Sequence, residues 1–166
     1  MTPTPNGRLD LSGGRRDLVI TRTFRAPIDD VWASITEPER TARWFASWSG
    51  DAGPGKTIRY RLTQEEGEPE GDMTIDACEP PRHLAVTAAD DYGGWRLEAT
   101  LAEAAGITTL TFVQHLAPDV DISNVGPGWE FYLDLLVASR DGAPKPVFDD
   151  YFPAQQAYYA GLAPES

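Results

Sequence analysis

The stretch DLVITRTFRAPIDDVWASITEPERTARWF, residues 17–45, decides the start of the fold. Its first eight residues are rich in β-branched side chains, and Leu18, Ile20 and Phe24 share one parity. Side chains of one parity lie on the same face of a strand. This first part is therefore predicted to form a β-strand with one apolar face.

Two short helices are predicted after this strand. Pro27 suits the entry to a helix, and Trp32 and Ile35 then follow at helical spacing. Pro38 stops this first helix and can open another, because its fixed backbone angle fits a first helical turn. The second helix is expected to run from Glu39 to Phe45.

Further along the chain, alternating apolar and polar residues predict more strands. They are expected at residues 57–62, 72–78, 83–88, 95–101 and 107–116, with a turn at 90–94. Clean alternation of this kind indicates an antiparallel sheet that is covered on one face. With the first strand, the sheet would have about six strands.

One late amphipathic helix, WEFYLDLLVASR at residues 129–140, can cover that face. Placed at 100° per residue, Glu130 and Asp134 fall on one side of it. The opposite, apolar side is centred on Tyr132, Leu135, Leu136 and Ser139. The predicted fold is α+β: a helix-grip fold in which a curved antiparallel sheet surrounds a long C-terminal helix, with two short helices after the first strand.

The length of 166 residues is typical of one domain. Residues 1–14, with their Thr-Pro pairs, are expected to be a flexible tail. The helix-grip domain is expected over residues 15–142. Residues 143–166 are expected to form a C-terminal extension with a short helix packed on the same domain.

Charge and composition narrow the partners. The chain has 14 Lys and Arg against 26 Asp and Glu, a net charge of −12, and no basic cluster, so nucleic acid and anionic membrane surfaces are not expected partners. No apolar run reaches the length of a membrane span, and no signal peptide is visible, so a cytoplasmic location is expected. One cysteine and two histidines cannot build a Cys/His zinc cage, and neither a metal nor a cofactor is predicted.

Two separated motifs carry a resemblance to a known family. The first contains Ala26-Pro27, Val31-Trp32, Thr36-Glu37-Pro38-Glu39 and Trp44, and the second is GPGWEFYLDLL at residues 126–136. Over residues 17 to about 140 the chain resembles the START-like (SRPBCC) superfamily, in the branch similar to the activator of 90-kDa heat-shock protein ATPase homologue. This resemblance implies the helix-grip fold. Members include hydrophobic-ligand carriers, polyketide cyclases, hydrolase relatives and many bacterial proteins.

No catalytic residue is predicted. The sequence has no Gly-x-Ser-x-Gly elbow, and Cys78 lies late on a strand, where a packed thiol is the favoured interpretation. His115 shares the parity of the outward side chains of its strand, and His83 follows a Pro-Pro turn. The paired aspartates fall in turns or helix starts, where they cap backbone donors.

The aromatic residues suggest a ligand pocket between sheet and helix, because this fold would bring them together from different elements. Its predicted lining is Trp44, Trp48, Tyr60, Trp95, Phe112, Tyr132, Leu135, Leu136 and Ser139. The hydroxyls of Tyr132 and Ser139 are expected to point into the cavity, with Leu135 and Leu136 as its floor.

The favoured function is the binding of a small, largely hydrophobic molecule in this cavity. One alternative is a cyclase- or hydrolase-type enzyme, which would aim a buried acid or base into the same cavity. Another is a chaperone-associated or other protein-interaction module, with a filled core and an exposed apolar patch. No sequence feature indicates an oligomeric state.

Overall fold

The computed structural model describes residues 3–89 and 94–162. Within them, eight strands form one sheet in the order β1-β2-β8-β7-β6-β5-β4-β3, and every neighbouring pair is antiparallel. The strands are β1 (Arg8–Asp10), β2 (Asp17–Phe24), β3 (Ala46–Ser49), β4 (Thr57–Leu62), β5 (Glu70–Glu79), β6 (His83–Ala89), β7 (Trp95–Ala104) and β8 (Ile107–His115). The predicted antiparallel α+β architecture is confirmed. The turn expected at residues 90–94 lies, apart from Gly94, outside the described residues.

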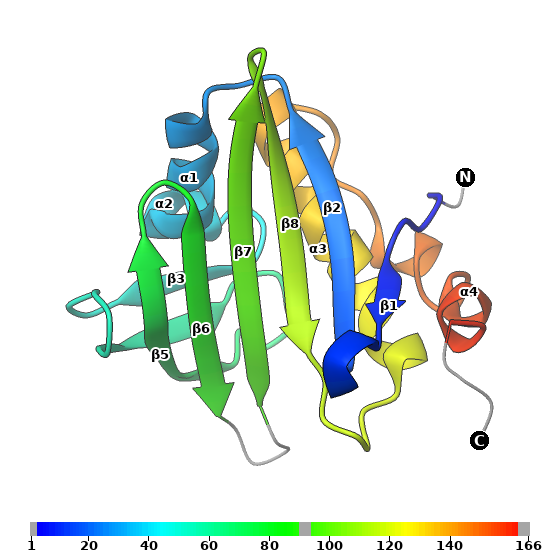
Figure 1. The fold of residues 1–166 in the computed structure, drawn as a ribbon. Helices are drawn as coiled ribbons and strands as arrows, with labels where there is room; N and C mark the ends of the chain where they lie inside the picture. The colour runs from blue at the N-terminus through cyan, green and yellow to red at the C-terminus, as the bar shows by residue number, and fades with distance from the viewer. Residues whose placement is uncertain (1–2, 90–93, 163–166) are drawn as a thin grey trace.

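Helices lie on one side of this sheet and at its ends (Figure 1). They are α1 (Ile28–Thr36), α2 (Pro38–Thr41), α3 (Ile122–Asp141) and α4 (Gln156–Ala160), with single 3-10 turns η1 (Ser12–Gly14) and η2 (Phe148–Asp150). The long helix α3 runs along one face of the sheet, and α4 lies beside α3 near the edge strand β1 (Figure 1).

The expected strand count of about six was too low, because two short edge strands were missed. β1 lies inside the segment expected to be a flexible tail, where Leu9 pairs with Leu18 of β2. β3 pairs with β4, and its start at Ala46 follows a helix that ends at Thr41 rather than at Phe45. Strands of three and four residues are too short to show an alternating pattern.

Helix α3 begins seven residues earlier than predicted. Asp121 caps it by accepting a hydrogen bond from the Ser123 amide at 2.9 Å, and Pro127 lies inside the helix. A Gly-Pro-Gly sequence normally signals a break, but here the helix continues through Pro127, its sixth residue, at the cost of one hydrogen bond of the ladder. The helix ends at Asp141, and the next residue, Gly142, caps it with a left-handed φ of 65°.

The C-terminal extension contains one short helix, α4, of five residues. Tyr151 and Tyr159 bury their rings completely, and Tyr159 lies over Gly126 of α3. The terminal segments are joined, because Tyr158 donates a hydrogen bond to the Gly7 carbonyl at 2.6 Å. The division of the chain at residues 14 and 142 stays a prediction.

The buried apolar side chains form two clusters. The larger cluster contains side chains from the inner faces of β2, β7 and β8 and from α1 and α3. The smaller cluster contains side chains from the four strands β3, β4, β5 and β6. The inner face of the sheet therefore carries two separate centres of packing, and the space between them is where a cavity can remain.

Candidate ligand pocket

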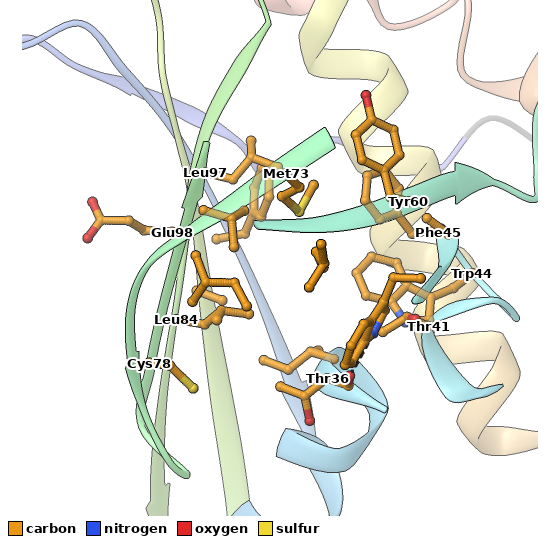
Figure 2. A pocket seen from close by; sticks show the side chains of 18 of the residues that line it. Thr36, Thr41, Trp44, Phe45, Tyr60, Met73, Cys78, Leu84, Leu97 and Glu98 are labelled. Atoms are coloured by element: carbon orange, nitrogen blue, oxygen red, sulfur yellow. Dashed lines mark hydrogen bonds between the residues drawn. The ribbon is translucent and has the colours of Figure 1, made fainter. Parts of the chain in front are cut away.

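A pocket of about 180 Å³ lies between the two apolar clusters. It is lined by Ile35, Thr36, Thr41, Trp44, Phe45, Ala46, Trp48, Ala52, Ile58, Tyr60, Met73, Ile75, Cys78, Leu84, Val86, Leu97, Glu98, Ala99, Leu110, Phe112, Trp129 and Leu133. Strands from both halves of the sheet, the α1–α2 region and α3 each contribute to this wall (Figure 2). The surface that they present is almost entirely carbon.

Aromatic rings form the side of the pocket next to α3. The centroid of Phe45 lies 5.7 Å from Trp44 and 5.6 Å from Trp129, and Phe112 lies 4.5 Å from Trp129. Such tilted pairs of rings are favourable beyond the area that they bury. The aromatic wall is therefore a packed surface whose rings support one another.

The polar atoms of the α1 side are already hydrogen-bonded within the protein. The indole nitrogens of Trp44 and Trp48 donate to the carbonyls of Ser34 and Thr36, each at 2.9 Å. The Thr36 hydroxyl donates to the Trp32 carbonyl at 2.7 Å, one helical turn back. These bonds turn the tryptophan rings toward the cavity and leave their donors occupied.

Two further polar groups of the pocket wall, one on α3 and one on α2, are also hydrogen-bonded within the protein. The indole of Trp129 donates to the side-chain oxygen of the buried Gln114 at 2.7 Å, and the Thr41 hydroxyl donates to the Pro38 carbonyl at 3.3 Å. A buried polar group without a partner costs about 1–3 kcal/mol. Pairing these groups internally therefore produces a wall that can receive an apolar molecule.

Glu98 is the one carboxylate among the described lining residues, and its side chain points away from the cavity (Figure 2). It accepts hydrogen bonds from His83 at 2.9 Å and from His115. Burial acts to raise the pKa of Glu98, but the two histidines outweigh it and hold the pKa below its usual value. The charge of Glu98 thus belongs to the opposite face of the sheet.

Four of the nine predicted pocket residues are brought together here. Trp44, Trp48, Tyr60 and Phe112 all line the cavity. Tyr60 lies across Gly71, its partner on β5, so closely that an added Cβ would be 2.6 Å from the Tyr60 oxygen. The absence of a side chain at Gly71 therefore makes room for this ring, whose hydroxyl points away from the cavity (Figure 2).

The other five predicted residues are not on the pocket wall. Trp95 packs beside it, 5.9 Å from the ring of Tyr60. Tyr132 instead donates to Glu65 at 2.6 Å, and Ser139 donates to the Leu136 carbonyl of its own helix at 2.8 Å. Leu135 and Leu136 are buried in the larger apolar cluster.

The phase of α3 explains where these side chains lie. Trp129 and Leu133, one turn apart, face the pocket, whereas Phe131 contacts Tyr151 of the C-terminal segment at 5.5 Å between ring centroids. Because a second layer covers part of α3, its apolar face is wider than the sheet alone requires. The centre of that wide face consequently does not point at the cavity. Met73 of β5 lines the pocket but is not in the predicted lining, although the alternation of its strand places it on the inner face of the sheet.

The described residues contain no helix long and apolar enough to cross a membrane. The same part of the chain has no group of three or more His, Cys, Asp or Glu side chains arranged to hold a metal ion.

Comparisons with known proteins agree with this architecture. The profile of the family described as Activator of Hsp90 ATPase homolog 1-like protein matches residues 25–139. The crystal structure of CalU16 from Micromonospora echinospora is 26% identical, with a TM-score of 0.73 over 96% of this chain and 95% of that chain. No curated protein was found to match.

Two further structures share the fold at lower identity. The protein encoded by gene BPP1335 from Bordetella parapertussis is 23% identical, with a TM-score of 0.71 over 97% of this chain and 92% of that one. EF2215 from Enterococcus faecalis, described as a conserved protein of unknown function, is 19% identical, with a TM-score of 0.71 over 96% and 92%.

Proposed function

Because this chain belongs to the family of Activator of Hsp90 ATPase homolog 1-like proteins, a branch of the START-like superfamily, we propose that it binds a small, largely hydrophobic molecule in the pocket between its sheet and α3. The observation that carries the proposal is the carbon-lined cavity whose polar groups are paired within the protein. Apolar surface removed from water stabilises a complex by about 25 cal/mol per Å², so such a wall favours an apolar ligand without a polar anchor.

The volume of about 180 Å³ limits the size of this ligand. An engineered cavity of about 150 Å³ stays dry and binds benzene, whereas sites for drug-sized molecules span about 300–1,000 Å³. A one- or two-ring compound, or a short aliphatic chain, therefore fits the pocket as it stands. The enzyme alternative would need an acid or base aimed inward, and the carboxylate of Glu98 points the other way (Figure 2).

Naphthalene, a neutral two-ring probe, tests the proposal directly. Its binding should change the fluorescence of the tryptophans that line the cavity. Ala99→Leu adds carbon atoms inside the cavity and should abolish this signal, at a cost of no more than the about 1–3 kcal/mol typical of an enlarged side chain in a packed core. Ser139→Leu is the matched control, because it enlarges a side chain of α3 outside the wall and should bind naphthalene like the wild type. Equal binding by all three proteins would overturn the proposal.

A further inference from the structure

The outer face of the sheet, opposite α3, holds a chain of titratable groups that the pocket does not use. Both histidines of the sequence contact one carboxylate: His83 Nε2 lies 2.9 Å from one oxygen of Glu98, and His115 Nε2 bonds the other. His115 Nδ1 lies 2.8 Å from Asp17 Oδ1. The four residues come from the adjacent strands β6, β7, β8 and β2.

The hydrogen-bond inventory of an imidazole decides its charge here. A neutral ring carries one N–H, so it can donate to only one of two carboxylates. His115 has a carboxylate at each nitrogen, and Asp17 is only 6% exposed. Burial acts to lower the pKa of His115, but its bonds to Asp17 and Glu98 raise the pKa above the ordinary 6.5. The arrangement is complete when His115 holds two protons.

Other charges near the cluster add to this preference. Glu79 lies 3.9 Å from His83 Nδ1, and Arg15 lies 3.8 Å from Asp17. Arg96 is exposed and precedes Glu98 by two residues on the same face of β7. Asp10 lies opposite Asp17 on β1 and shares Arg15 with it at 3.5 Å. The four carboxylates of this cluster therefore outnumber the two arginines, which favours the protonated form of His115. Its place on the outer face separates this charge from the apolar cavity.

The cluster lies directly behind the pocket wall. Adjacent residues of a strand point to opposite faces. Leu84 follows His83, and Leu97 and Ala99 flank Glu98, and all three line the cavity. Gln114, which precedes His115, accepts the hydrogen bond that fixes Trp129. One set of strands thus carries the charged cluster on one face and the pocket on the other.

We propose that Asp17, His115, Glu98 and His83 form a proton-binding site that controls how firmly the pocket holds its ligand, an inference whose ligand part rests on the proposed function. Loss of the proton leaves one carboxylate facing a nitrogen lone pair. Water must then reach Asp17, which separates β2 from β8 at His115 and frees Gln114 and Trp129.

The sign of the pH effect follows from proton linkage. Because the pKa of His115 is higher in the folded than in the unfolded protein, its contribution to stability is fully present below the unfolded value. That contribution is lost as the pH rises through the folded value above 6.5. Ligand retention should follow the same direction, and by reciprocity a bound ligand should raise the pKa of His115 further.

The protonation part is tested by an NMR titration of the imidazole C–H signals of the intact protein. Two histidines give two curves, and His83→Gln assigns them. A His115 curve centred above 6.5 supports the site, and one centred at or below 6.5 overturns it. A shift of both signals on adding Zn²⁺ that EDTA reverses would also overturn it, because it would identify a metal site instead.

The ligand part is tested by the dissociation rate of naphthalene, which does not itself titrate. Between about pH 6 and about pH 9 the wild-type rate should rise about fivefold, the lower end of typical couplings between sites. His115→Gln should show no such rise. Equal pH dependence in both proteins overturns the coupling. Absence of naphthalene binding at every pH overturns the proposed function and the coupling together, while the NMR titration still decides the proton site.

Discussion

Helix α3 carries Trp129 and Leu133 on the side that faces the pocket, and Glu130 and Asp134 on the side that faces the terminal segments. The first side meets carbon surface and leaves a cavity. On the second side both carboxylates accept hydrogen bonds. Glu130 needs such partners because it is only 1% exposed and is shielded from water. The helix thus has one loosely filled face and one face fixed by polar contacts.

The polar contacts of the second side form a cluster that we call the polar clamp: Asn6, Arg22, Glu130, Asp134 and Tyr151. Glu130 accepts from the Asn6 amide at 2.9 Å and from Arg22 at 3.2 Å. Asp134 accepts from Arg22 at 3.0 Å and from the Tyr151 hydroxyl at 2.6 Å. Hydrogen bonds demand direction and distance, whereas apolar packing tolerates misfit in volume. The clamp therefore sets the position of α3, and the pocket side is free to remain unfilled.

The largest effect that we expect comes from breaking the clamp. Arg22→Leu leaves the carboxylate of Glu130 buried without its cation. Removing one partner of a buried ion pair costs about 3–5 kcal/mol, because the remaining charge is not hydrated. Urea denaturation should show a loss of this size in the free energy of unfolding.

An exposed ion pair provides the control for that loss. Arg61 lies 3.7 Å from Glu68, and both side chains are about half exposed. Arg61→Leu should cost less than about 1 kcal/mol, as is usual for surface pairs. Equal losses for the two variants would show that the clamp is no more than a surface contact.

A smaller effect is expected from two glycines of the same helix. A Cβ at Gly126 would lie 2.5 Å from ring atoms of the fully buried Tyr159, whereas a Cβ at Gly128 meets nothing within 4 Å. Gly126→Ala should therefore lower the free energy of unfolding by about 1–3 kcal/mol through overpacking. Gly128→Ala should raise it by about 0.5–1 kcal/mol, because alanine favours a helix.

Thermal melts of the two variants give the comparison a sign as well as a size. A lower melting temperature for Gly126→Ala and a higher one for Gly128→Ala would show that α3 packs tightly against Tyr159 of the C-terminal segment. Shifts of the same sign would contradict that placement.

The same contrast explains what could be predicted from the sequence. Strands with clear alternation, such as β4 and β8, lie where the pattern predicts, because alternation reports one buried face directly. The side of α3 that lines the pocket differs from the centre of its apolar face, because sequence periodicity does not reveal that Tyr151 and Tyr159 cover the helix from the C-terminal segment. Glu130 likewise has the sequence signature of a solvated position, and only long-range contacts with Asn6 and Arg22 bury it.

The smallest effect concerns Tyr132, which lies between the two sides of α3. Its ring contacts Phe45 of the pocket wall at 5.4 Å, and its hydroxyl donates to Glu65 at 2.6 Å. Burial and the neighbouring carboxylate of Glu65 hold the pKa of Tyr132 well above its usual value, so the phenol stays a neutral donor at ordinary pH.

Tyr132→Phe keeps the ring and removes only this hydrogen bond, which should cost about 0.5–1.5 kcal/mol in urea denaturation. Naphthalene affinity should stay at the wild-type value, because the hydroxyl does not reach the cavity. A hydroxyl that pointed into the pocket, as the helical phase predicts, would instead make the phenylalanine variant bind naphthalene more tightly. Tighter binding would thus show that the Tyr132 hydroxyl points into the pocket. Unchanged binding with a small loss of stability would show that the hydroxyl lies outside the pocket, at Glu65.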